Sequence, residues 1–331
     1  MEIKAADVMK LRQMTGAGMM DCKKALVEAN GDYARAQEII REKGKLVAAK
    51  RADRETTEGA VLAEVNGGKA ILVSLGCETD FVSKNAEFQA TAQAIADAAM
   101  AAFPEDAEAL KACTLADGQT VEAAITQQTG KTGEKHTLAY YARLEAPYIS
   151  SYIHKINGKL GAIVAFNKEV PAEVGKGIAM QVASMNPVAV NKESVSQEVI
   201  DKELTVAVEK TREELVKKAV NSALEKAGIN PAHVDSEDHI ESNTAKGWLT
   251  PEQADKAREI IKTVSAEKAA NLAEAMVNNI ANGRLNKFFK ENTLEEQEYQ
   301  MGDGKTSVKA FLASVDKDAK ILAFKRFSLN D

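Results

Sequence analysis

Reactive side chains in this sequence do not gather into a recognisable catalytic set. The four histidines, His136, His154, His233 and His239, do not share ligand spacing on one predicted element. The phosphate-binding GxxxxGK(S/T), dinucleotide-binding GxGxxG, metalloprotease HExxH and hydrolase GxSxG patterns are all missing. We therefore expect a protein that makes and breaks no bonds. An enzyme with dispersed motifs is a competing interpretation.

Two local groupings could still carry chemistry. Cys22 is followed by Lys23 and Lys24, whose charges could activate a thiol, but its position under the apolar face of a predicted helix favours a packed side chain. His233 and His239 border an acidic stretch where a metal site and a solvated loop are the alternatives. The loop is favoured, and we predict neither a metal nor a cofactor.

The stretch "LGCETDFVSKNAEF", residues 75–88, raises a different question. A predicted buried strand ends at Cys77 and runs through a polar break into Phe81. Such a phenylalanine either anchors the loop under the sheet or is exposed to solvent and becomes buried in a partner. Asp80 beside it cannot enter a core unpaired, which favours a surface loop. Exposing the ring costs about 1.5–3 kcal/mol, which burial in a partner would recover.

Met19 and Met20 form a second candidate contact. They follow the glycine-containing turn "TGAG", and flexible thioethers at a turn can fill grooves in a partner. The alternative is that one or both face a small helical core.

Composition limits the class of protein. The chain has 331 residues, 45% of them apolar and 5% aromatic, and a net charge of −6 from 43 basic and 49 acidic side chains. This balance argues against a nucleic-acid binder that works by neutralising phosphates. The three cysteines are far apart, and no apolar run approaches the roughly 20 residues of a membrane span. We expect a soluble cytoplasmic protein that binds neither nucleic acid nor membrane.

The pattern along the chain predicts an α+β fold. Residues 1–54 read as three short helices and a linker, with Val8, Leu11 and Met14 on the first helix, Asp32 capping the third and Gly44 ending it. Residues 55–140 begin with the strands "GAVLAEV" and "KAILVSLGC", which Asn66-Gly67-Gly68 joins as a hairpin. A helix capped by Asn85 follows, with one face formed by Phe88, Ala92, Ile95, Ala99 and Ala102.

An internal repeat predicts a second, related α+β half. "KINGKLGAIVAF" resembles "EVNGGKAILVSL", and each precedes an alanine-rich helix. "HTLAYYARLEA" and "YISSYIHKINGKLGAIVAF" read as three strands, with a hairpin at Asn157-Gly158. This half is assigned to residues 141–193 and 284–331, with a helix over 172–184 and the final strand "AKILAFKRFSL".

Residues 194–283 show long amphipathic helix patterns and predict an antiparallel helical hairpin. The first long helix carries a stripe formed by Ile200, Leu204, Val208, Leu215 and Ala219 and stops at Gly228. A polar connector leads to a second long helix, which starts with a capping box of Thr250 and Gln253 and ends at Gly283.

The combination of segments resembles one family. "LRQMTGAGMMDCKKALVEANGDYARA", "TDFVSKNAEFQA", "SYIHKINGKLGAIVAF", "GIAMQVAS", "VSQEVIDKE" and "NGRLNKFF" occur in the order found in bacterial elongation factor Ts. The resemblance covers nearly the whole chain. The stretch from Gly228 to Leu249 departs from it, because the family's helical hairpin is shorter there.

The resemblance implies a guanine-nucleotide exchange factor for elongation factor Tu. Such a factor binds the GDP form, displaces the magnesium ion, promotes GDP release and leaves when GTP enters. The first three helices would be a ubiquitin-associated-like domain that docks on the partner's GTPase domain. A homodimer and a 2:2 complex with the partner both stay open.

The resemblance also assigns site residues. The motif associated with magnesium displacement is Thr79, Asp80, Phe81 and Val82. Contacts with the GTPase domain correspond to Arg12, Met19, Met20, Lys23 and His154. The competing non-enzymatic interpretation is a scaffold whose helical hairpin is the functional part.

Overall fold

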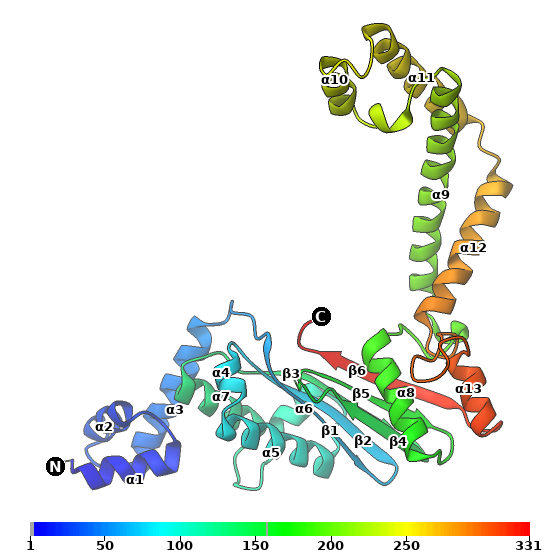
Figure 1. The fold of residues 1–331 in the computed structure, drawn as a ribbon. Helices are drawn as coiled ribbons and strands as arrows, with labels where there is room; N and C mark the ends of the chain where they lie inside the picture. Colours follow the sequence, from blue (N-terminus) through cyan, green and yellow to red (C-terminus); the bar gives the residue numbers. More distant parts are fainter. Residues whose placement is uncertain (1–2, 157) are drawn as a thin grey trace. The chain divides into compact units, whose positions relative to one another are not determined.

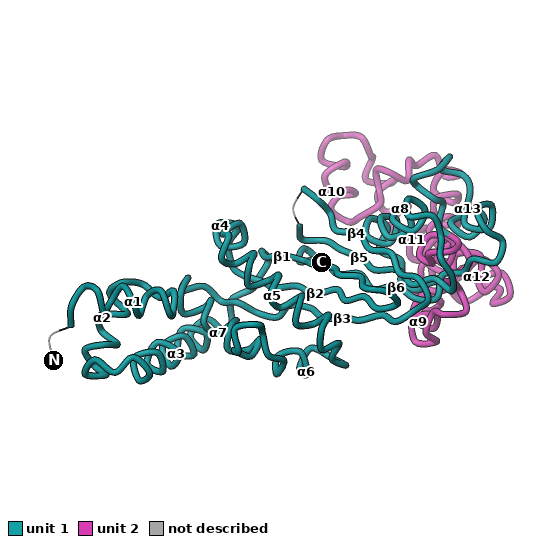
Figure 2. The backbone as a smooth tube through the Cα atoms, turned by 90° about the horizontal axis from the view of Figure 1, so that it is seen from below, with its two compact units in different colours: residues 1–190, 297–331 teal, residues 191–296 magenta. Residues whose placement is uncertain are grey.

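The computed structural model describes residues 3–156 and 158–331. The chain forms two compact units, one of residues 1–190 and 297–331 and the other of residues 191–296 (Figure 2). The mixture of helices with two three-stranded antiparallel sheets confirms the α+β class.

The first unit begins with three helices, α1 (Ala5–Thr15), α2 (Met19–Glu28) and α3 (Tyr33–Lys50). Leu11, Leu26 and Ala36 are fully buried between them. Asp32 caps α3 by accepting hydrogen bonds from the N–H groups of Ala34 and Arg35, at 2.8 and 3.1 Å, as predicted. Met14, expected on the buried face of α1, is 45% exposed, because the buried face is complete with Val8, Leu11 and Thr15.

Gly44 does not end the third helix. It lies inside α3, where this helix crosses α7 (Val121–Thr132) at close range. A Cβ atom added at Gly44 would lie 2.9 Å from the carbonyl oxygen of Thr126, and one added at Gly130 would lie 3.3 Å from the Gly44 Cα. The glycine is there because the two backbones touch, which the sequence of α3 alone could not indicate.

The first sheet has the order β1-β2-β3, formed by β1 (Glu58–Asn66), β2 (Lys69–Cys77) and β3 (Thr137–Glu145). The register pairs Glu58 with Cys77 and Asn66 with Lys69, so the predicted hairpin is confirmed.

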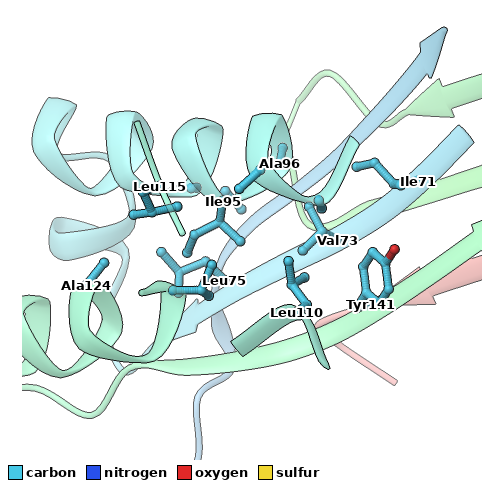
Figure 3. Close-up of a cluster of buried hydrophobic side chains, with 14 of the residues drawn as sticks. Ile71, Val73, Leu75, Ile95, Ala96, Leu110, Leu115, Ala124 and Tyr141 are labelled. Atoms are coloured by element: carbon cyan, nitrogen blue, oxygen red, sulfur yellow. The ribbon is translucent and has the colours of Figure 1, made fainter. Parts of the chain in front are cut away.

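Helices α5 (Ala86–Ala102) and α6 (Ala107–Ala112) complete this half with α7, and Figure 3 shows their shared core against β2 and β3. Asn85 caps α5 by accepting a bond from the N–H of Glu87, as predicted. Four of the five residues predicted for its inner face are buried, whereas Ala102 in the last turn is exposed.

The second sheet has the order β4-β5-β6, formed by β4 (Tyr148–Ile153), β5 (Leu160–Phe166) and β6 (Ile321–Ser328). The predicted return of the final strand to this sheet is confirmed by its antiparallel pairing with β5. The predicted turn residue Asn157 lies outside the described residues. Helices α8 (Ala172–Met185) and α13 (Val308–Val315) belong to the same half. A cluster that includes Val61, Leu72 and Ile163 joins the two sheets.

The second unit contains η1 (Lys192–Ser194), α9 (Gln197–Lys226), η2 (Pro231–His233), α10 (Glu237–Ala245), α11 (Pro251–Ala270) and α12 (Glu274–Asn292). The capping box at Thr250 is present, as predicted. The second long helix was predicted wrongly in two respects. It breaks between Ala270 and Glu274, and its second part continues through Gly283 to Asn292. Glycine destabilises a helix interior by only about 1 kcal/mol, which packing against α9 can overcome.

The stretch joining α9 to α11 is folded rather than a purely polar connector. Ile229, Val234, Ile240 and Leu249 are buried there, together with Val220 and Leu224 of α9. The predicted stripe of α9 is only half-buried, and its buried positions are Ala207, Thr211, Val220 and Leu224. The stripe is offset because α9 packs on α12 along one stretch and on α11 along another.

We predict that Gly44→Ala lowers the free energy of unfolding by about 1–3 kcal/mol, because the new methyl group meets backbone that cannot rotate away. Urea unfolding followed by circular dichroism measures this change. The matched control is Gly283→Ala, which adds the same methyl group inside α12 with no atom within 4 Å. The control should stabilise its helix by about 0.5–1 kcal/mol, and equal effects at the two sites would contradict the packing explanation.

Candidate functional site

The "TDFV" segment forms a helical turn and not the predicted loop. Helix α4 spans Asp80–Ser83, directly between β2 and α5 (Figure 1). The N–H groups of Ser83 and Lys84 donate to the carbonyl oxygens of Thr79 and Asp80, both at 3.1 Å. Four residues are too few to show a helical period in sequence, so this turn could not be recognised from its pattern.

Thr79 is fixed where α4 begins by a residue distant in sequence. Its N–H donates to Glu134 Oε2 at 3.1 Å and its hydroxyl donates to Glu134 Oε1 at 2.6 Å. Glu134 lies between α7 and β3, so its bonds to Thr79 join the start of α4 to the segment that follows α7. Both carboxylate oxygens are used, and this sets the direction in which the turn leaves the sheet.

Glu78, immediately before this anchor, is held in the same way. Arg51 Nη1 donates to both of its carboxylate oxygens, at 2.8 and 2.7 Å, and the N–H of Lys135 donates to Oε1 at 2.6 Å. Burial acts to raise the pKa of Glu78, but the bonds from Lys135 and Arg51 outweigh it and hold that pKa below its usual value. The carboxylate therefore stays charged and ties the end of α3 to the site.

The helical turn separates its side chains by direction. Val82 packs against the core cluster of the first sheet, and Ser83 is buried with its hydroxyl donating to the carbonyl oxygen of Asp80 at 3.1 Å. Phe81 points the other way and is 85% exposed. This confirms that the phenylalanine lies at the surface. Lys84 donates to Asp80 Oδ2 at 2.7 Å, and this bond lowers the pKa of Asp80.

His136 is a buried member of the site region that sequence reasoning did not place. Its ring lies 5.7 Å from that of Phe88, and its Nδ1 is 3.0 Å from the carbonyl oxygen of Glu134. Nε2 has no hydrogen-bond partner among the residues that the structure describes. Burial lowers the pKa of His136, although the bond to Glu134 and the charges of Glu134 and Glu78 oppose the shift.

The candidate contacts of the first helices lie at their surface. Met19 and Met20 are 42% and 64% exposed at the start of α2, and Lys23 is exposed on the same helix. Cys22 is fully buried and lies near the Thr15 hydroxyl, which confirms that it is packed. Helix α2 packs on α1 and α3. The two methionines therefore come from the three-helix part of the chain, whereas Phe81 lies on α4.

Arg12 lines a surface hollow that α5, the helix after α4, also borders. With Met9, Gln13, Gly16 and Glu87 it lines a surface hollow of about 320 Å³, and Glu87 lies in the first turn of α5 directly after α4. Lys131 of α7 forms an ion pair with Glu87. The end of α1 and the start of α5 therefore share one hollow.

His154 lies in the connection between β4 and β5. Its N–H donates to the carbonyl oxygen of Leu160 at 2.8 Å, and its ring is 6.4 Å from that of Tyr152. The same connection reaches β1, because the Val61 N–H donates to the Gly158 carbonyl oxygen at 2.8 Å. His154 thus belongs to the part of the second sheet that meets the first.

The second unit contains a cavity of about 540 Å³ between α9, η2 and α11. Val216, Val220, Leu224 and Ile261 are among its walls. Near it, His239 pairs with Asp235 and His233 lies against Trp248 with ring centroids 5.6 Å apart. In the described ranges no cluster of three or more His, Cys, Asp or Glu could hold a metal ion. Within the same residues, no helix has the length and apolar character needed to cross a membrane.

Known proteins are similar to this sequence along nearly the whole chain. The family model described as Elongation factor TS matches residues 78–331. Elongation factor Ts of Phocaeicola vulgatus and that of Bacteroides fragilis are each 54% identical over 329 residues, which cover 99% of this chain and 99% of each relative. The Porphyromonas gingivalis protein of the same name is 40% identical over 330 residues, covering 100% of this chain and 99% of that relative.

This chain belongs to the elongation factor Ts family. It is accordingly a protein-biosynthesis factor of the nucleotide-exchange class and not an enzyme that makes bonds. The matches to these relatives span nearly all of this chain and of each relative, so the residues of the first three helices and the stretch from Gly228 to Leu249, where a departure was expected, are not peculiar to this chain.

We predict that Glu134→Ala loosens α4, because it removes the acceptor for both Thr79 bonds. A bond to a charged acceptor contributes about 1.5–3 kcal/mol, so exchange of the Ser83 and Lys84 amide protons should speed up by about tenfold or more. Hydrogen exchange read by mass spectrometry or NMR measures this. Glu122→Ala, at an exposed position of α7, is the control and should leave both rates unchanged. Equal rates in the two variants would show that Thr79 does not hold the turn.

We also predict that acidification weakens the fold through His136. Because burial lowers its pKa, the unfolded chain takes up this proton at higher pH than the folded chain. The stability that the neutral ring contributes is complete above the ordinary histidine pKa of about 6.5 and is lost as the pH falls towards the lower folded value.

The measurement is the urea midpoint at about pH 7.5 and about pH 5.5, a window in which most carboxylates stay charged. The midpoint should fall with pH, and His136→Leu, which cannot take up a proton, should reduce that fall. An unchanged pH dependence in this variant would rule out His136 as its source.

Proposed function

We propose that this chain is a guanine-nucleotide exchange factor for elongation factor Tu and that it acts by inserting Phe81 into that partner. The observation that carries the proposal is an aromatic ring, 85% exposed, on a turn that hydrogen bonds and packing hold rigid. Membership in the elongation factor Ts family supports the identity of the partner.

The rigidity of the turn is what makes the ring suited to this task. Burying Phe81 in the partner would recover about 1.5–3 kcal/mol, and little would be spent on ordering because α4 is already folded. A wedge between packed helices shifts them by a discrete step, since a packed core is not continuously compressible. If those helices carry the groups that order the magnesium ion, its hold on the phosphates weakens.

Each residue of the motif then has a separate role. Thr79 anchors the turn through its bonds to Glu134, and Val82 packs into the core. Phe81 is the group that inserts into the partner. Asp80 keeps the turn in water through its pair with Lys84 and can exchange that lysine for a cation of the partner.

Further contacts complete the proposed interface. Arg12, Met19, Met20 and Lys23 would meet the GTPase domain from a ubiquitin-associated-like domain over residues 1–54, and His154 would meet it from the second sheet. The remaining proposed parts are the core halves 55–140 and 141–193 with 284–331, and the helical insertion 194–283.

The test is release of a fluorescent GDP analogue from elongation factor Tu, followed by stopped-flow fluorescence with catalytic amounts of the chain. We predict that Phe81→Ala slows stimulated release by about tenfold or more, the equivalent of at least one well-buried apolar contact. Its free energy of unfolding should change by less than about 0.5 kcal/mol, because the ring contacts little of the fold.

The matched control is Trp248→Ala, which removes another exposed aromatic ring, 61% exposed, from the second unit. It should leave the rate unchanged. A folded Phe81→Ala variant with full activity would overturn the wedge, and failure of the unaltered chain to speed release would overturn the exchange function.

The competing function, a scaffold built on residues 194–283, has the cavity between α9 and α11 in its favour. Deletion of residues 228–249 is a poor test of it, because Ile229, Val234, Ile240 and Leu249 form part of that unit's core. Under the scaffold function, Trp248→Ala would impair partner binding while Phe81→Ala would not, which is the reverse of the pattern expected for exchange.

A further inference from the structure

A second apolar side chain of the first unit is even more exposed than Phe81. Ile156, in the connection between β4 and β5, is 92% exposed. An isoleucine left in water forgoes about 1.5–3 kcal/mol of burial free energy. Single exposed apolar residues are ordinary, so its exposure alone carries no argument. The inference rests instead on the hydrogen bonds that fix the connection and on the charged side chains at its base.

The base of this connection is fixed to three strands. The His154 and Gly158 N–H groups donate to the carbonyl oxygens of Leu160 and His154, at 2.8 and 2.9 Å. The Val61 N–H of β1 donates to Gly158, and the Leu329 N–H, just after β6, donates to the Lys159 carbonyl oxygen at 3.0 Å. Ile156 is therefore carried on a short connection with anchored ends, as Phe81 is carried on α4.

Charged side chains connect this base with α4. Lys159 forms an ion pair with Glu58, the first residue of β1, and Glu58 pairs in register with Cys77 at the end of β2, from which α4 follows. Helix α4 in turn packs on β1, and Lys84, the residue after α4, donates to Asp80 at its start. The Lys159–Glu58 pair therefore joins the connection that carries Ile156 to the start of β1, and the Lys84–Asp80 pair lies at α4, which carries Phe81.

We propose that Ile156 is a second apolar contact for the partner that receives Phe81. The proposal rests on the proposed exchange function. It implies a partner surface with two apolar depressions, separated by a polar ridge that can meet alternating positive and negative charges. Ile156 contributes affinity and alignment, because it is a separate group on a different sheet, while Phe81 contributes the displacement.

The experiment compares Ile156→Ala with the unaltered chain in two assays, binding to nucleotide-free elongation factor Tu by isothermal titration calorimetry and stimulated GDP release. The dissociation constant should rise by about five- to tenfold, as expected for removal of one buried aliphatic group. At a saturating concentration of the variant, the maximal release rate should stay near that of the unaltered chain, since Phe81 is intact.

Val65→Ala is the matched control. Val65 is another exposed branched side chain beside a hairpin turn, 40% exposed, but it lies at the opposite end of β1 from Glu58. It should change neither quantity.

The outcomes separate the two claims. If the unaltered chain speeds GDP release and Ile156→Ala binds as tightly as it does, the inference about Ile156 is wrong and the exchange function stands. If the unaltered chain binds elongation factor Tu without speeding release, the exchange function fails, and the change in dissociation constant still decides the role of Ile156. If it does not bind at all, both are overturned.

Discussion

The structure of the site depends on one carboxylate, that of Glu134, which accepts both the N–H and the hydroxyl of Thr79. Two bonds to a charged acceptor contribute about 1.5–3 kcal/mol each, enough to offset the similar cost of leaving the Phe81 ring in water. Without this anchor, the ring could lower its free energy by folding back onto the sheet. With it, Val82 is directed into the core and Phe81 out of it. A hydrogen bond between residues far apart in sequence therefore fixes which side chain is presented.

Helix α7, just before Glu134, links this anchor to the first three helices. Gly130 of α7 lies against Gly44 of α3, and the absence of side chains there lets the two backbones approach closely. Lys131, the next residue, reaches Glu87 at the start of α5, next to α4. Helix α7 thus contacts both α3, which packs on the helix of the two methionines, and α5, which follows the turn that carries Phe81. A partner that engages both would meet a preorganised pair of contacts, and little conformational entropy would be lost on binding.

Sequence reasoning predicted the strands and hairpins well, because their alternation and turn residues act locally, and it placed Phe81 at the surface from the charge beside it. It failed where contacts between residues distant in sequence determine where a helix ends or how a short segment folds. Gly44 reads as a helix stop until α7 is seen against it, and Gly283 reads as another until α12 is seen to continue through it. The helical turn α4 is too short for a period, and its anchor Glu134 lies 55 residues away from Thr79. The isoleucine at position 156 gave no sequence signal, because only the fold places its connection beside β1.

A wedge at Phe81 must couple binding of the chain to release of the nucleotide, which is more than adding affinity. Coupling between two ligands is reciprocal, so it can be read from the chain's own dissociation constants for elongation factor Tu with and without saturating GDP. Isothermal titration calorimetry gives both for the unaltered chain and for Phe81→Ala. We predict that GDP weakens binding of the unaltered chain strongly and that the ratio of the two constants moves towards one in the variant. If Phe81→Ala raises both dissociation constants by the same factor and leaves their ratio unchanged, the ring is an ordinary contact and not a wedge.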